Sequence, residues 1–270
     1  MANVPILGRQ ARADDIHDFK KRKMELKEQG YPVQGSHQLV KDYIEKVKDK
    51  FEGNIDKNTV LVCVPSGSGK NMLTLYFAQA LEQLYGCKTV PTGMISKLHT
   101  LEAKNALSLD KRNVDPIGYK VKSESIKKYI PSDKKVVIVD DVIGTGESAI
   151  KLKAALEREH IKVNALANMI TIENRYPTTG DMNRLLRKIE EKTKLTSEQK
   201  LTLSAEIEDA FAGYTRQKIN RLERGLVSDK AVLQSLDTIS KAASIERKST
   251  KLSGVPVYGR TIENSPKIAY

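Results

Sequence analysis

Short apolar runs alternate with amphipathic stretches through the middle of the chain, and this pattern predicts a parallel sheet. The runs at 59–65 and 135–140 are continuously apolar, which is typical of strands buried on both faces. Apolar positions at helical spacing follow each run, at about 70–85 and 148–160, and another strand is expected at 163–172. Strands separated by helices imply right-handed crossovers. The predicted fold class is therefore α/β with a parallel sheet.

The two ends of the chain differ from this middle part. Residues 1–35 are mixed and turn-rich, a helix is expected from 36 to about 53, and the polar stretch 96–115 is expected to be a loop. After Tyr176 apolar positions recur at helical spacing, and 253–270 is expected to wrap around the fold or fray. We therefore divide the chain into an N-terminal segment, a core and a basic helical extension, at 1–35, 36–176 and 177–270.

Composition limits the kind of protein. With 270 residues, 39% of them hydrophobic, the chain can bury a core without disulfides. Cys63 and Cys87 are too few for a disulfide framework, and the first residues lack the apolar segment of a secretion signal, so we expect a reducing, cytoplasmic location. The four histidines show no metal-ligand spacing with the cysteines, which argues against structural zinc. No apolar run approaches the roughly 18 residues of a transmembrane helix, so no membrane partner is expected.

The net charge of +12 raises the question of a polyanionic partner. Aromatic residues make up only 5% and tryptophan is absent, so the sequence lacks the stacking platforms that bind single-stranded bases. Nucleic-acid binding and an ordinary basic surface therefore both stay open. Four cations on one predicted helical segment of the extension favour a polyanion or a partner protein, although a solvated helix face is the more ordinary use of such a pattern. They are Arg216, Lys218, Arg221 and Arg224.

Two glycine-bearing loops follow the predicted buried strands, and the first differs from an ATP-binding P-loop. Residues 64–70 (VPSGSGK) end in a Gly-Lys pair, but Val64 and Asn71 stand where the P-loop needs a glycine and the magnesium-binding Ser or Thr. The segment therefore predicts no ATPase. It still offers backbone N–H groups and one lysine beyond a strand end, which suits a smaller anion.

The second loop combines acidic and phosphate-binding features. In 136–148 (VVIVDDVIGTGES) a buried strand delivers Asp140 and Asp141 at its carboxyl end, and a Gly/Thr/Ser turn then begins a helix. Backbone N–H groups at a helix N-terminus, together with the hydroxyls of Thr145 and Ser148, can hold a phosphate. The carboxylates can accept hydrogen bonds from ribose hydroxyls or lie near a magnesium ion carried by the ligand. An ordinary strand–turn–helix is the plainer alternative, but two acids at a buried strand end are costly without a role.

Residues 136–148 resemble the phosphoribosyl pyrophosphate (PRPP) signature of type I phosphoribosyltransferases: four apolar residues, two acids, two apolar residues and a Thr/Gly-rich loop. Residues 64–69 resemble the pyrophosphate loop of that family, and 111–113 (KRN) resemble an Arg-x-x-Asn-like region of its ComF and amidophosphoribosyltransferase branch. The likeness covers about 37–173. It implies a Rossmann-like phosphoribosyltransferase core, to which this chain adds an α-helical C-terminal extension.

The resemblance implies an enzyme that uses Mg²⁺ to transfer a phosphoribosyl group from PRPP to a small-molecule nitrogen acceptor, a base or an amine, with release of pyrophosphate. Catalytic roles fall on Asp140, Asp141 and Lys70, and the two acids approach the metal indirectly, through the ligand. A loop within 96–115 is expected to close over the site. The implied 5-phosphate site comprises Gly144, Thr145, Gly146, Glu147 and Ser148, and the implied pyrophosphate site comprises Ser66, Gly67, Ser68, Gly69, Lys70 and Arg112.

Two departures from the family pattern keep a second hypothesis open. Gly144 replaces a common Thr, Ser or Asp, and Glu147 replaces a small residue, so an inward-facing Glu147 would repel phosphate. The alternative is a non-catalytic protein of the same fold that senses nucleotides or binds nucleic acid through the basic C-terminal helices. The sequence does not identify the acceptor. The segment that covers it could come from 1–35, from the helices after 176, or from both. A homodimer is likewise left open.

Overall fold

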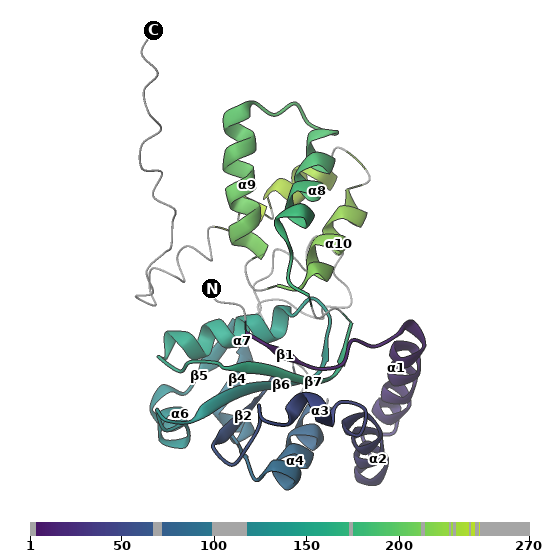
Figure 1. Cartoon of the computed structure of the whole chain (residues 1–270), viewed down its shortest axis with the longest axis vertical. Helices are drawn as coiled ribbons and strands as arrows, with labels where there is room; N and C mark the ends of the chain where they lie inside the picture. The colour runs from purple at the N-terminus through teal and green to yellow at the C-terminus, as the bar shows by residue number, and fades with distance from the viewer. Residues whose placement is uncertain are drawn as a thin grey trace.

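The computed structural model describes residues 4–66, 72–98, 118–172, 175–211 and 214–226, together with 228, 231–237, 239, 240 and 243. Its centre is a parallel sheet with the strand order β1-β7-β6-β2-β3 (Figure 1). This sheet confirms the predicted α/β class. The strands are β1 (Ile6–Leu7), β2 (Thr59–Cys63), β3 (Lys88–Thr89), β6 (Lys135–Ile143) and β7 (Ala165–Thr171).

Helices cover both faces of the sheet, so that the core has two hydrophobic layers. One face packs against α1 (Ala13–Glu28), α2 (Val33–Ile44), α3 (Lys48–Phe51) and α4 (Leu73–Tyr85). The other face packs against α6 (Ser123–Tyr129), α7 (Glu147–Arg158) and an antiparallel hairpin of β4 (Ile95–Leu98) and β5 (Gly118–Val121). The short 3₁₀ helix η1 (Thr92–Met94) leads into this hairpin.

Strand residues alternate between these two layers, as the pleat of a β-strand requires. Leu61, Val137 and Val139 face the layer of α1–α4, whereas Val62 and Ile138 face the layer of α7. All five are fully buried, and burying each side chain stabilises the fold by roughly 1.5–3 kcal/mol. The need to bury both faces explains why the central strands are continuously apolar.

The C-terminal part of the described chain forms a helical unit with a hydrophobic cluster of its own. It consists of α8 (Thr179–Glu190), α9 (Ser197–Phe211) and α10 (Arg216–Gly225). Ile207 and Ile219 are completely buried in this cluster. A capping box begins α8, since the Thr178 hydroxyl accepts from the Asp181 N–H and the Asp181 carboxylate accepts from the Thr178 N–H. One end of α10 lies next to the core (Figure 1).

The structure differs from the sequence-based expectation in three segments of the chain. Residues 1–35, expected to be turn-rich, contain β1 and the 16-residue helix α1. Little in the sequence indicates α1, because Phe19 and Leu26 are its only buried residues and two positions form no clear apolar periodicity. β4 occupies the start of the stretch expected to be a loop, because it pairs with β5, and a strand of four residues gives only a weak sequence pattern. β6 continues past Asp140 to Ile143, because its pairing with β7 continues. No helix in the described ranges is long and apolar enough to cross a membrane.

Candidate functional site

The two predicted loops begin at the same carboxyl edge of the sheet. β2 and β6 pair in parallel, so the segments that follow them leave the sheet at the same edge. Val64 extends this contact, since its N–H donates to the Val139 carbonyl at 2.8 Å. Ser66 is the last described residue of the first loop. Gly67, Ser68, Gly69, Lys70 and Arg112 lie outside the described residues.

The second loop, residues 144–146, turns from β6 into α7. Gly146 is the N-cap of α7 and has a φ of +76°, a left-handed conformation that favours glycine. The Glu147 N–H donates to Thr145 Oγ1 at 3.4 Å. N–H groups in such a turn, combined with the positive end of a helix dipole, suit an anion. The structure therefore brings the predicted phosphate-loop residues to the start of α7.

Two cations compensate the charge of Glu147 beside this loop. Lys151 Nζ lies 2.9 Å from one carboxylate oxygen, and Lys218 Nζ lies 3.6 Å from the other. Burial lowers the pKa of Lys218, and the charge of Glu147 opposes that shift. The sequence leaves open whether Glu147 faces a bound phosphate. In the structure its carboxylate is held between two ammonium groups, one of which comes from α10.

Asp141 points toward the layer of α1–α4. Its side chain is buried and forms an ion pair with Lys23 of α1. Burial acts to lower the pKa of Lys23, but the charge of Asp141 and the hydrogen bond to it outweigh burial, and the pKa is raised. Sequence reasoning missed Lys23, because it is one of several cations on α1 and no spacing rule connects it to β6.

Asp140 has a different electrostatic environment from Asp141. Burial first, and the charge of Asp141 second, raise the pKa of Asp140 well above its ordinary value. The Asp141 N–H donates to Asp140 Oδ1 at 2.9 Å. Burial lowers the pKa of Lys97 on β4, and Asp140 is near enough to oppose that shift. No described residue forms an ion pair with Asp140, so this carboxylate is the one of the two that a ligand can use.

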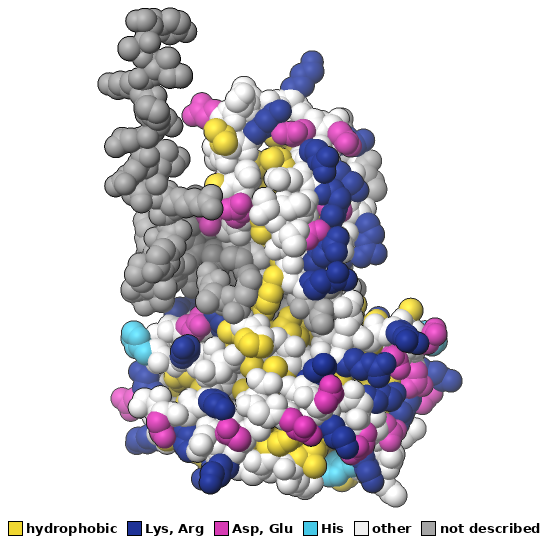
Figure 2. Space-filling model, in the orientation of Figure 1, with side chains coloured by type: hydrophobic (Ala, Val, Ile, Leu, Met, Phe, Trp, Pro, Cys, Tyr) yellow, Lys and Arg dark blue, Asp and Glu magenta, His cyan; other side chains and the backbone are white. Residues whose placement is uncertain are grey.

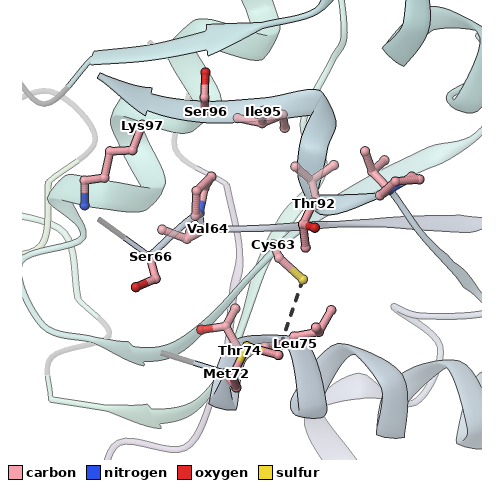
Figure 3. Close-up of a pocket in the computed structure, with 14 residues that line it drawn as sticks. Cys63, Val64, Ser66, Met72, Thr74, Leu75, Thr92, Ile95, Ser96 and Lys97 are labelled. Atoms are coloured by element: carbon pink, nitrogen blue, oxygen red, sulfur yellow. Dashed lines mark hydrogen bonds between the residues drawn. The ribbon is translucent and has the colours of Figure 1, made fainter. Parts of the chain in front are cut away.

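A cavity of about 440 Å³ opens beside the end of β2 (Figure 3). Its wall combines apolar side chains such as Ile95 with the polar groups of Ser66 and Lys97. The Lys97 ammonium group and the Ser66 side chain lie toward the same side of the cavity in Figure 3. Cys63 also lines the cavity, but burial raises the pKa of its thiol to about 12, so the thiol stays protonated and is a poor nucleophile. Lys97 is thus a cation at the site that sequence reasoning missed, because it lies in the stretch expected to be a loop.

Helix α10 contacts the second loop directly. The Thr215 N–H donates to the Thr145 carbonyl at 3.1 Å, and Thr215 Oγ1 donates to the Gly144 carbonyl at 2.5 Å. A Cβ atom on Gly144 would lie 3.0 Å from Gln217 Oε1, so α10 side chains fill the space beside this glycine. The helical unit therefore forms one wall of the loop.

The predicted basic face of α10 is divided between the interior and the surface. Arg216 forms an ion pair inside the helical unit at 2.8 Å, and Lys218 turns toward the loop. Arg221 and Arg224 are exposed. Other Lys and Arg side chains gather along one side of the helical unit (Figure 2). Only part of the predicted face is thus available to an external polyanion.

The residues at the strand ends fit a magnesium ion only if the ligand supplies most of the oxygens. In the described ranges, no group of three His, Cys, Asp or Glu side chains is placed to hold a metal. Mg²⁺ is usually bound through one or two carboxylates together with substrate phosphates. Asp140, at the carboxyl edge of the sheet, can supply one such carboxylate.

Fold and site together define an α/β protein with a glycine turn and a helix N-terminus at the carboxyl edge of a parallel sheet. Neither a scan against protein-family models nor a search of curated proteins found a match for the chain. The function is therefore inferred from the geometry of the site.

Proposed function

We propose that the protein is a phosphoribosyltransferase, which transfers the phosphoribosyl group of PRPP to a nitrogen acceptor and releases pyrophosphate. The observation that carries the proposal is the turn 144–146, which follows the acidic end of β6, contains a left-handed glycine and begins α7. A phosphate bound at this turn leaves the attached sugar within reach of Asp140. Residues 64–66, which follow β2, border the same edge of the sheet and begin the loop that we assign to the pyrophosphate.

Each part of PRPP then has a complementary partner. The 5-phosphate binds the turn, the ribose hydroxyls donate to Asp140, and the pyrophosphate lies over residues 66–70 with Lys97 nearby. Departure of pyrophosphate leaves positive charge on the sugar, so catalysis rests on alignment of PRPP with the acceptor and on neutralisation of the leaving group. Mg²⁺ that arrives with PRPP supplies part of this neutralisation. Asp141 acts through its ion pair with Lys23, which holds the end of β6 in place.

Pyrophosphate release tests the proposal. The full-length protein is incubated with PRPP, Mg²⁺ and a panel of bases and amines, and released pyrophosphate is measured by a coupled assay. We expect release that depends on one acceptor class. Absence of release across the panel, together with absence of PRPP binding in calorimetry, contradicts the proposal. A structure with PRPP and Mg²⁺ bound then identifies the segment that covers C1 of the ribose.

Thr145→Val removes one hydroxyl from the phosphate loop. A hydrogen bond to a charged group contributes roughly 1.5–3 kcal/mol, so the affinity for PRPP is expected to fall about ten- to a hundredfold. Thr145→Ser keeps the hydroxyl and is the matched control. Calorimetric titration of both variants measures the effect, and a valine variant that binds PRPP as tightly as the serine variant shows that the hydroxyl does not contact the phosphate.

One observation favours the alternative, a non-catalytic protein that senses nucleotides or binds nucleic acid. The Asp141 carboxylate is already paired with the Lys23 ammonium group, so Asp140 is the only one of the two acids left to hold the ribose. A sensor of this kind binds PRPP or a nucleotide without releasing pyrophosphate. Binding of single-stranded DNA or RNA with a steep salt dependence would instead assign the exposed cations of the helical unit to nucleic acid.

A further inference from the structure

Helix α10 lies far from the phosphate loop in sequence and against it in space. We infer that α10 is a working part of the phosphate site: Thr215 orients the N–H donors of the loop, and Lys218 compensates the charge of Glu147 so that a phosphate can bind. The inference rests on the proposed function of the loop and assigns to it two positioning residues from the C-terminal extension.

Thr215 determines which way the loop peptides face. It donates to the carbonyls of Gly144 and Thr145, so both carbonyls point toward α10. A trans peptide directs its carbonyl and the following N–H to opposite sides. The N–H groups of Thr145 and Gly146 therefore point away from α10, and neither donates to an acceptor within the described chain. These are the donors that a phosphate on the loop requires.

Lys218 acts on the charge of the same site. Glu147 is the first residue of α7, where its carboxylate would repel a phosphate bound at the helix N-terminus. The side chains of Glu147, Lys151 and Lys218 are only 19%, 21% and 15% exposed, so water screens their charges weakly. With both lysines present, the carboxylate is more than compensated. Without Lys218, Lys151 only balances the carboxylate, and the net positive charge that these three groups offer the phosphate is lost.

This arrangement makes the helical unit part of the site rather than an independent module. Thr215 is 71 positions from Gly144, and the two ion pairs to Glu147 come from two different parts of the fold. Docked α10 therefore supports the loop through Thr215 and Lys218.

A charge cycle tests the role of Lys218. PRPP with Mg²⁺ is titrated by calorimetry into four forms of the full chain: wild type, Lys218→Met, Glu147→Gln and the double variant. We expect Lys218→Met to bind PRPP about tenfold more weakly than wild type, and the double variant to bind within about threefold of wild type, because both forms keep one net positive charge among these three positions. If Lys218 only packed against the loop, Glu147→Gln would not restore the affinity that Lys218→Met loses. Lys188→Met, which removes an exposed lysine of α8, is the matched control and should bind as wild type does.

The inference is overturned if Lys218→Met binds as tightly as wild type, or if the double variant binds as weakly as Lys218→Met. If wild type does not bind PRPP, the proposed function fails. The same four forms are then titrated with inorganic phosphate, and the same two comparisons of affinity test the inference. Absence of phosphate binding by wild type overturns the inference as well.

Thr215→Val and Thr215→Ser give a second, independent measurement. The valine variant loses the hydroxyl that donates to Gly144, and its affinity for PRPP should fall several-fold, whereas the serine variant should recover it. Thermal unfolding of both variants establishes that the helical unit is still folded. Equal affinity of the two variants contradicts the role assigned to Thr215.

Discussion

Asp140→Asn is expected to abolish measurable PRPP binding and, at the same time, to raise the melting temperature of the unliganded protein. In the proposed site this carboxylate accepts hydrogen bonds from the ribose, so its loss removes charged acceptors worth roughly 1.5–3 kcal/mol for each hydrogen bond. Burial and the charge of Asp141 disfavour its ionised form in the folded state. Asparagine has nearly the same shape and does not ionise, so this unfavourable contribution disappears. Calorimetry and thermal unfolding on the same sample measure the two effects.

The pH dependence of stability follows from the same pKa shift. The pKa of Asp140 is higher in the folded protein than in the unfolded chain, so the folded protein binds more protons between the two values. Stability therefore falls as pH rises from about 4, the ordinary aspartate range, toward the raised pKa. Asp140→Asn should lose this part of the slope. Melting curves from pH 4 to 8 test it, and identical slopes for wild type and variant would contradict the shift.

Asp141→Asn should have the opposite effect on stability, although the substitution is chemically the same. It leaves the Lys23 ammonium group partly buried without its ion-pair partner. Breaking a fully buried pair costs about 3–5 kcal/mol, and because Lys23 is 27% exposed we expect about 2–3 kcal/mol. Lys23→Met combined with Asp141→Asn should recover most of the loss. A melting temperature that does not change in Asp141→Asn would show that the pair contributes nothing to the fold.

Gly146→Val is expected to give the largest loss at the phosphate loop. Gly146 has a φ of +76°, which a β-branched residue rarely adopts, so the substitution should cost about 1–3 kcal/mol of stability. The valine turn would relax toward negative φ and redirect its N–H groups, and PRPP binding should fall at least a hundredfold. Each kcal/mol lost lowers the melting temperature of a chain of this size by about 2–4 °C, which thermal unfolding detects.

Gly144→Ala is the matched control for the conformational argument. Gly144 does not have a positive φ, and an added Cβ would meet the flexible end of Gln217 at 3.0 Å, which can move aside. Its stability should therefore stay within about 1 kcal/mol of wild type. If Gly144→Ala and Gly146→Val destabilise the protein equally, the left-handed turn is not what limits substitution in this loop.

By itself the sequence determined the central architecture and the location of the loop. Two continuous apolar runs at 59–65 and 135–140 predict β2 and β6, because a strand buried on both faces must be apolar at every position. Glycines directly after an acidic strand end predict the turn into α7. The use of PRPP, Mg²⁺ and a nitrogen acceptor remains a prediction, as do the roles of Lys70 and Arg112, which lie outside the described residues.

Only the tertiary structure decided what the charged residues do. Asp140 and Asp141 are neighbours in sequence and look equivalent there. In the structure Asp141 is paired with Lys23, 118 positions away, whereas Asp140 forms no ion pair within the described residues. In the same way Lys218 belongs to a basic helix in the sequence, whereas in space it forms an ion pair with Glu147 beside the loop 144–146. Apolar patterns can be recognised along a chain because burial follows the local periodicity of a helix or strand. The role of a charged side chain depends instead on its nearest opposite charge, and only folding brings the two together.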